Sequence, residues 1–317
     1  MLRTANPSTP VRFRPQPPKN VIEGSSMKKK VIGIIGKGFV GTAVAHGFSQ
    51  AVGYDAEILI YDKDPLKSQD TLDDVIKKSE IVFISVPTPS NEDGSINLKI
   101  LESCLEEISD QIGKNNSCKT IYLIRSTVVP GTTENFQKRF PNLKLVFNPE
   151  FLTERSAHFD FISQTRIVLG GEKVNTEKVK ALYKHRFGNN LSFIETNYQS
   201  AELIKYVCNT FFATKISFLN EMKLLSDEIG ANWEEVLEGF LRDGRVGSSH
   251  SSVPGPDGKV GFGGSCLPKD IQALINFGNN KGIELSVLKG AWDTNLNIRP
   301  EKDWERLEGR AITKKKN

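Results

Sequence analysis

The sequence has no apolar run long enough to cross a membrane, and it has few cysteines. Lys, Asp, Glu or clusters of glycine and polar residues interrupt every apolar run before it reaches the roughly 18 to 20 residues that a membrane helix needs. Four cysteines occur, at positions 104, 118, 208 and 266, with irregular spacing and no CxxC pair. This pattern argues against a disulfide framework and a zinc site, and it favours a reducing compartment, which we take to be the cytoplasm.

The net positive charge is confined to the chain ends. The formal net charge is +4, but the first thirty residues carry +6, which leaves -2 for the rest of the chain. A composition of 38% hydrophobic and 25% charged residues over 317 positions is typical of a soluble globular protein with one or two domains. Because no extended basic face is indicated, we expect no nucleic-acid partner and no membrane partner.

Residues 1–28 lack hydrophobic periodicity and contain five of the fifteen prolines. Such a segment cannot bury enough apolar surface to offset its ordering entropy, so it predicts a disordered leader. It lacks the apolar stretch of a secretory signal, and its prolines oppose the amphipathic helix of a transit peptide. A non-native extension ahead of a start at Met27 is an equally good interpretation.

Between residues 29 and 197, short β-branched runs alternate with helical patterns. Near-continuous apolar strands separated by helices predict an α/β fold, a Rossmann-like doubly wound parallel sheet that binds NAD. Strands are expected at 31–35, 57–61, 81–86, 120–125 and 144–147, with one further βαβ unit within 166–196. Helices are expected at 39–48, 98–108 and 132–140.

Residues 198–300 show helical patterns without strands, which predicts a smaller all-helical second domain. A long helix should run from Gln199 to Ile229 and stop at Gly230. Shorter helices are expected at Trp233–Phe240 and Pro268–Phe277, on either side of a Gly/Ser/Pro loop at 243–264, and residues 301–317 form a charged tail. The long helix is a candidate dimer element, so we expect a homodimer.

A GxGxxG motif follows the first strand and opens a helix. Its glycines, Gly36, Gly38 and Gly41, suit a tight turn, backbone access for a pyrophosphate, and close packing of helix on strand. Asp62 ends the second strand about 20 residues later, where a carboxylate can accept hydrogen bonds from the ribose hydroxyls and repel a 2'-phosphate. This combination predicts NAD, although Lys63 leaves NADP open. The alternatives are an ordinary tight turn and a turn-forming aspartate.

The stretch GFGGSCLPKD at 261–270 predicts a reactive thiol. Pro268 suits the first turn of a helix, which places Cys266 at the positive pole of that helix, where Lys269 also should lower the thiol pKa. The glycines before it keep the sulfur accessible. A dinucleotide domain with an activated cysteine predicts oxidation through a covalent thiohemiacetal and thioester. The alternative is a small buried hydrophobic residue, which is our interpretation of the other cysteines.

Six ordered blocks between about residues 30 and 280 resemble the nucleotide-sugar dehydrogenases of the UDP-glucose 6-dehydrogenase and GDP-mannose dehydrogenase family. They are GKGFVG at 36–41, VPTP at 86–89, RSTVVPGTT at 125–133, NPEFLTE at 148–154, ELIKYVCNTFFATKIS at 202–217 and GFGGSCLPKD at 261–270. The resemblance implies a four-electron oxidation of the sugar C6 hydroxyl to a carboxylate, with two NAD+ reduced per turnover. UDP-glucose is the expected nucleotide sugar.

The resemblance also implies roles for individual residues. Cys266 would carry the thioester, Lys205 and Asn209 would stabilise the oxyanion from one helix face, and Asp270 and Thr127 would position or activate water. Glu150 and Glu154 would supply acid–base and hydrogen-bonding groups. The implied cofactor-binding residues are Gly36, Gly38, Phe39, Val40, Gly41, Asp62, Pro87, Thr88, Ser126, Thr127, Glu154 and Lys269. The implied substrate-binding residues are Glu150, Phe151, Leu152, Lys205, Asn209, Arg245, Phe262 and Gly263, and no metal site is expected.

Each charged residue also has a simpler interpretation. Lys205 could be a solvated helix charge, Asp270 a first-turn carboxylate that complements the helix dipole, and the two glutamates surface acids. Only 47 residues follow Asp270, too few for the second Rossmann-like domain of family members. We expect the loop at 250–259 or a partner subunit to take over some substrate contacts. Two other functions stay open: a non-catalytic binding remnant, and a 3-hydroxyacid dehydrogenase that gives Cys266 no role.

Overall fold

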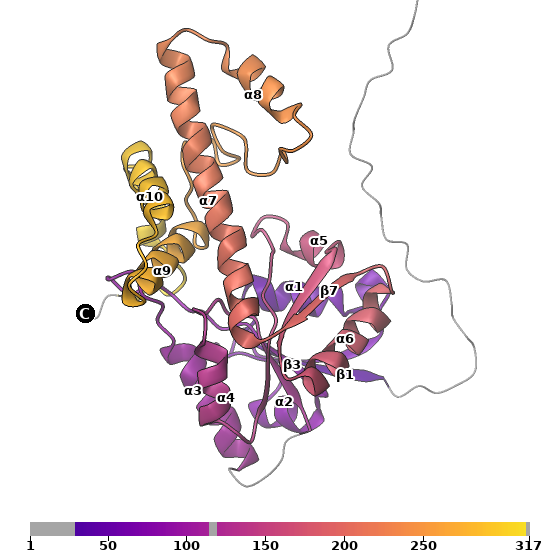
Figure 1. Cartoon of the computed structure of the whole chain (residues 1–317). Helices are drawn as coiled ribbons and strands as arrows, with labels where there is room; N and C mark the ends of the chain where they lie inside the picture. Colours follow the sequence, from indigo (N-terminus) through magenta and orange to yellow (C-terminus); the bar gives the residue numbers. More distant parts are fainter. Residues whose placement is uncertain (1–28, 114–118, 315–317) are drawn as a thin grey trace, which may run out of the picture.

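The computed structural model describes residues 29–113 and 119–314. The predicted leader at 1–28 and Cys118 lie outside these residues. Within the described ranges, seven strands form a single sheet, and a helical part extends away from it (Figure 1). No helix in these ranges combines the length and apolarity that crossing a membrane requires.

The strands form where the sequence has β-branched apolar runs. They are β1 (Lys30–Ile35), β2 (Ala56–Tyr61), β3 (Ile81–Ile84), β4 (Ile121–Ile124), β5 (Lys144–Phe147), β6 (Arg166–Gly171) and β7 (Ser192–Thr196). The order in the sheet is β2-β1-β3-β4-β5-β6-β7. Because β2 and β3 lie on opposite sides of β1, the strand order reverses there. Open α/β sheets bind ligands in the crevice at the carboxyl ends of the strands beside such a switch point.

The predicted sheet is parallel throughout, but β5 and β6 pair antiparallel. The chain between them contains only the short helix α5 (Ala157–Ile162), which packs on α1 (Phe39–Gly47). A helix of six residues spans about 9 Å, too short to carry the chain back along the sheet. Strand β6 therefore starts at the edge where β5 ends, and the predicted βαβ unit follows it as the parallel pair β6 and β7.

Helices cover both faces of the sheet, as a doubly wound fold requires. One face packs on α2 (Leu72–Lys78), α3 (Lys99–Ile112), α4 (Thr132–Arg139) and the start of α7, and the other on α1, α5 and α6 (Lys173–Phe187). Neighbouring residues of one strand serve opposite faces: Ile84 belongs to the first core and Phe83 to the second, and neither is exposed. A short 3-10 turn at Gln50–Val52 follows α1.

The second unit is helical, as predicted, and is built around α7 (Tyr198–Glu228). The Asn197 side chain accepts a hydrogen bond from the Ser200 N–H at the start of α7, and Gly230 follows its end with φ +72°. Helices α9 (Leu267–Asn280) and α10 (Ser286–Ile298) pack along α7, and α8 (Trp233–Leu241) lies near its far end (Figure 1).

The described part of the predicted charged tail packs against the body. The 3-10 turn at Asp303–Arg306 buries Trp304, which is 3% exposed and lies 5.3 Å from Trp292 between ring centroids. Further on, the Ser90 N–H donates to the Ala311 carbonyl at 2.9 Å, and the Thr313 N–H donates to the Ser90 carbonyl at 2.7 Å. We call residues 303–314 the C-terminal strap.

Candidate active site

A cavity of about 380 Å³ lies at the glycine turn after β1 and reaches the start of α9. Its walls come from the segments after β3 and β4, the loop after β5, the start of α9 and the C-terminal strap. The predicted site residues that line it are Gly38, Phe39, Val40, Pro87, Thr88, Ser126, Thr127, Glu150, Glu154, Cys266 and Lys269. The cavity therefore joins the glycine motif to the cysteine motif.

The glycine turn is shaped by close backbone contacts. Gly36 has φ +91°, and a Cβ there would lie 2.8 Å from the Ser85 carbonyl oxygen, while a Cβ on Gly41 would collide with the Gly36 carbonyl. Gly38 differs, because an added Cβ would meet no atom of the described residues within 4 Å and would face the cavity region instead. No described side chain caps α1, so its N-terminal N–H groups are available to an anion such as pyrophosphate.

Asp62 lies beside this turn. Its carboxylate accepts hydrogen bonds from the N–H groups of Lys37, at 2.6 Å, and Asp64, at 2.9 Å. The hydrogen bond from the Asp64 N–H shows that Asp62 also forms a turn, which was the alternative interpretation of this aspartate in the sequence. Each carboxylate oxygen has a further lone pair, so the same group can also accept from a ribose. The neighbouring Lys63 pairs with Glu107 on α3 at 2.9 Å.

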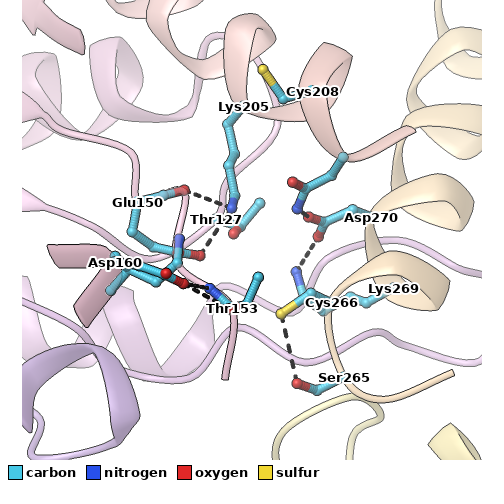
Figure 2. A network of polar contacts seen from close by, with 12 residues as sticks. Thr127, Glu150, Thr153, Asp160, Lys205, Cys208, Ser265, Cys266, Lys269 and Asp270 are labelled. Carbon is cyan, nitrogen blue, oxygen red and sulfur yellow. Dashed lines mark hydrogen bonds and ion pairs between the residues drawn. The ribbon is translucent and has the colours of Figure 1, made fainter. Parts of the chain in front are cut away.

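Lys205 and Glu150 form a buried ion pair between α7 and the loop after β5 (Figure 2). The Lys205 Nζ donates to the Glu150 Oε1 at 2.9 Å and to the Glu150 carbonyl at 2.7 Å. The two side chains are 4% and 5% exposed, so neither is the solvated surface charge of the simpler interpretation. Burial on its own lowers the pKa of Lys205, but the charges of Glu150, Asp270 and Cys266 outweigh it and raise that pKa.

A second polar group lies one turn further along α7. The Asn209 Nδ2 donates to the Asp270 Oδ2 at 2.6 Å, and the Lys269 Nζ donates to the Asp270 Oδ1 at 2.6 Å. Asp270 is 1% exposed and sits in the first turn of α9. Its carboxylate is therefore stabilised by an amide, an ammonium and the positive pole of a helix.

Cys266 stands immediately before α9, at the predicted helix end, but its thiol pKa contradicts the prediction. The sulfur lies at the cavity, 3.7 Å from the Ser265 Oγ (Figure 2). Burial, helped by the charges of Glu150 and Asp270, raises the thiol pKa above its ordinary value, against the opposite effect of two lysines. Desolvation and the carboxylates outweigh the lysines that were expected to lower it. The resting thiol is therefore protonated at neutral pH.

Of the eight predicted substrate-binding residues, only Glu150 lines the cavity in the part of the chain that the structure describes. Lys205 and Asn209 do not line it but bond to Glu150 and Asp270, and three others lie elsewhere. The Arg245 side chain is 89% exposed and pairs with Asp243, and Phe262 is 3% exposed in the core of the helical unit. A Cβ on Gly263 would collide with the buried Arg299. Phe151 and Leu152, which were also predicted to bind substrate, lie beside the Lys205–Glu150 ion pair instead.

Phe151 and Leu152 hold the loop that carries Glu150. The Phe151 ring centroid lies 5.6 Å from the Lys205 Nζ, and the Leu152 N–H donates to the Glu150 Oε2 at 2.6 Å. Phe151 therefore packs on the Lys205 end of the ion pair, and the Leu152 N–H binds its Glu150 end.

The cavity also contains residues that were not predicted, which are Lys67, Ser85, Val86, Arg125, Ser265 and Arg310. Ser265 and Arg125 lie within two of the resembling blocks, so the sequence held a signal for them. Arg310 had no such signal: it comes from the strap and pairs with Glu154 at 2.5 Å across 156 residues of sequence. Within the described residues, no three His, Cys, Asp or Glu side chains are grouped to hold a metal ion.

The fold and this cavity are those of a dinucleotide-binding protein with a helical second unit beside the cavity. The model of the UDP-glucose/GDP-mannose dehydrogenase family, NAD binding domain, matches residues 64–187, and the central-domain model of the same family matches residues 199–297. The chain belongs to the UDP-glucose/GDP-mannose dehydrogenase family. Its first unit is the NAD-binding domain of that family.

Curated relatives and solved structures agree with this assignment. UDP-glucose 6-dehydrogenase of Rickettsia felis is 37% identical over 73% of this chain and 50% of its own length. UDP-glucose 6-dehydrogenase AglM of Haloferax volcanii is 31% identical over 83% of this chain and 69% of its own. The chain thus spans about half the length of the Rickettsia relatives it matches.

Among solved structures, a UDP-glucose dehydrogenase from Pyrobaculum islandicum matches with TM-score 0.73 and 27% identity, over 88% of this chain and 71% of that one. A 3-hydroxyisobutyrate dehydrogenase from Mycobacterium tuberculosis matches with TM-score 0.68, over 86% of this chain and 95% of that one. At 14% identity, the second match shows a shared fold alone.

Proposed function

We propose that this chain oxidises the C6 hydroxyl of a nucleotide sugar to a carboxylate with NAD+ as the oxidant. The observation that carries the proposal is the gathering of Cys266, the Lys205–Glu150 ion pair and the Asn209–Asp270 pair around the glycine-turn cavity. A protein that only binds a nucleotide has no chemical need for a thiol, a buried ammonium and a carboxylate in one place. UDP-glucose is the first candidate, because the relatives named above act on it by name.

The residues at the glycine turn fit NAD. Gly38 leaves its side of the cavity open, and the N-terminus of α1 offers N–H groups to a pyrophosphate. Asp62 lies beside the turn, where its carboxylate can accept a hydrogen bond from a ribose hydroxyl. When bound, NAD+ accepts hydride from the substrate carbon. Thr127 and Glu154 line the same cavity as the turn and Cys266, and we assign them to the nicotinamide end.

In the first oxidation, we assign the C6 oxygen to Lys205 and Asn209. The Lys205 ammonium has a third donor beyond its two bonds to Glu150, and this donor stabilises the negative charge that develops on the oxygen. Glu150, which lines the cavity, takes up the hydroxyl proton. The product of this step is the C6 aldehyde.

In the second oxidation, the Cys266 sulfur adds to the aldehyde carbon. Since the resting thiol is protonated, its proton must pass to a base during addition, and we assign it to Asp270, whose charge reaches the sulfur and which took up no proton in the first step. Lys205 and Asn209 hold the thiohemiacetal oxygen, and loss of the second hydride gives a thioester. Water positioned by Asp270 and Thr127 then hydrolyses the thioester to the carboxylate and returns the thiol.

The test is a panel of UDP-sugars and GDP-sugars followed by NADH absorbance, with NADH counted per sugar consumed. Two NADH per sugar are expected for one member of the panel, and Cys266→Ser should form no carboxylate while still binding NAD+. Undiminished carboxylate formation by Cys266→Ser would contradict the thioester route. Binding of a nucleotide sugar without turnover would support the non-catalytic binding remnant. In a separate assay, one NADH formed per 3-hydroxyacid consumed would support the 3-hydroxyacid dehydrogenase.

We further propose that the chain forms a homodimer through α7. Leu203, Val207, Phe211, Phe218 and Leu225 are 44% to 62% exposed and recur three to four residues apart or at multiples of that spacing along the helix. Next to them, α7 and α8 enclose an apolar cavity of about 280 Å³. Light scattering should give the mass of two chains, and Phe211→Asp should shift it toward one. A monomeric wild-type protein at micromolar concentration would refute this assembly.

A further inference from the structure

The C-terminal strap fixes the backbone of Arg310 at the cavity wall. On one side of it Trp304 is 3% exposed, and on the other Ala311 is 2% exposed and accepts a hydrogen bond from the Ser90 N–H at 2.9 Å. The Thr313 N–H in turn donates a hydrogen bond to the Ser90 carbonyl at 2.7 Å. Between these anchors the Arg310 side chain is 45% exposed and lines the cavity. Its backbone is held while its guanidinium can move.

Two of the four described cations that line the cavity are buried and bound to protein partners. Lys269 is buried and bound to Asp270, and Arg125 is buried and donates to Asn148 at 2.6 Å. The side chains of Lys67 and Arg310 remain about half exposed. A guanidinium offers two parallel N–H groups that match a phosphate, whereas an ammonium acts as a point charge. Arg310 is therefore the cavity cation best suited to an anionic ligand.

The present partner of Arg310 is one that a ligand can replace. The Glu154 carboxylate, 49% exposed, lines the same cavity and lies 2.5 Å from the guanidinium. An ion pair between half-exposed side chains is weak, because water screens both charges. A diphosphate that enters the cavity brings two negative charges to the same guanidinium and leaves Glu154 available to the ligand's hydroxyl or amide groups.

We propose that Arg310 is a diphosphate-binding residue, which exchanges Glu154 for a phosphate when the cavity fills. Both ligands of the proposed function carry this group, the dinucleotide and the nucleotide sugar, so the inference rests on that function. The strap, which lies far from every resembling block in the sequence, thereby contributes a binding group to the cavity.

The test is isothermal titration of the full chain with NAD+ and, separately, with UDP. Arg310→Gln keeps a polar side chain but removes the charge and the guanidinium, so we expect at least a tenfold weaker Kd for one of the two ligands, as roughly expected for a lost hydrogen bond to a charged group. The ligand that loses affinity identifies the source of the diphosphate. Arg310→Lys, which keeps the charge but not the fork, should fall between wild type and Arg310→Gln.

Arg306→Gln is the matched control, because Arg306 is exposed on the same strap and faces a different surface, beside Glu301 and Asn91. Its Kd values should equal those of the wild type, and thermal unfolding should show all variants folded. Unchanged Kd values for both ligands in Arg310→Gln, or equal losses in Arg306→Gln, would overturn the inference alone. A wild-type chain that binds neither ligand would overturn the proposed function together with it.

Discussion

The ammonium of Lys205 donates to both the carboxylate and the carbonyl oxygen of Glu150, so one side chain of α7 holds side chain and backbone of the loop after β5. This loop contributes Glu150 and Glu154 to the cavity. The pair therefore sets the distance between the helical unit and the edge of the sheet where the cavity lies.

Lys205→Met should destabilise the fold strongly, because it leaves the Glu150 carboxylate buried without its cation. We expect a loss of about 3 kcal/mol in the free energy of unfolding, measured by urea denaturation. The double variant Lys205→Met with Glu150→Gln should recover part of that loss, since no buried charge remains. Equal losses in single and double variants would show that the ion pair is not the source.

Glu202 should make stability depend on pH. Its carboxylate is 0% exposed and accepts from the N–H groups of Gly131 and Thr133 at the start of α4, and burial raises its pKa to about 7 from an ordinary 4.5. Between those values the folded state binds more protons than the unfolded state, so the free energy of unfolding falls as pH rises. The full contribution is about 3 kcal/mol, present below pH 4.5 and lost by about pH 7.

Glu202→Gln is the variant that checks this dependence. Its urea denaturation curves at pH 4.5, 6 and 7.5 should show a smaller decline in stability than those of the wild type. Glu177→Gln, which changes an exposed carboxylate on α6, should keep the wild-type decline. A wild-type decline in Glu202→Gln would assign the effect to other groups.

Two glycines of the same motif should respond differently to alanine. Gly36→Ala forces a side chain into the left-handed region and against the Ser85 carbonyl, so we expect a loss of about 2 kcal/mol or more in stability. Gly38→Ala meets open space, so its stability should stay within about 0.5 kcal/mol of the wild type while NAD+ binding weakens. Thermal unfolding and NAD+ titration separate these effects. Normal NAD+ binding by Gly38→Ala would place the pyrophosphate elsewhere.

Alkylation should report the raised pKa of Cys266. The thiolate is the reactive form, so the rate of iodoacetamide modification should be low at pH 7 and still be rising above pH 9. Peptide mapping by mass spectrometry follows Cys266 separately from Cys208, and Asp270→Asn, which removes one neighbouring negative charge, should move the rise to lower pH. A rate that levels off below pH 8 would indicate the low pKa that the sequence suggested.

The sheet was predictable because its strands are nearly continuous apolar runs between helical patterns, as in IVFI at Ile81–Ile84. The antiparallel pair β5 and β6 was not, since strand direction depends on how α5 packs on α1, and no local pattern records that. Helix α2 was also missed. Its sequence LDDVIKK has only three buried residues to mark an apolar face, and its N-cap Thr71 is a short signal.

The site was predictable where the chemistry is local. Lys205 and Asn209 lie four residues apart on one helix face, and Cys266 stands directly before a helix that carries Pro268 in its first turn. The raised pKa of the Cys266 thiol was not predictable, because burial of the sulfur, its largest cause, and the charge of Glu150 both depend on segments that lie far apart in the sequence. The strap was missed for a related reason: Trp304 is one aromatic residue in a run of charges, and its burial depends on Trp292.

The contacts of Ser90 with Ala311 and Thr313 mean that the two units are interleaved along the chain rather than joined in series. A fragment ending at residue 197 would contain every strand of the sheet and the glycine turn, yet it would lack the wall that carries Arg310. A chimera that exchanges the sheet with that of a relative must therefore also exchange the C-terminal strap at 303–314.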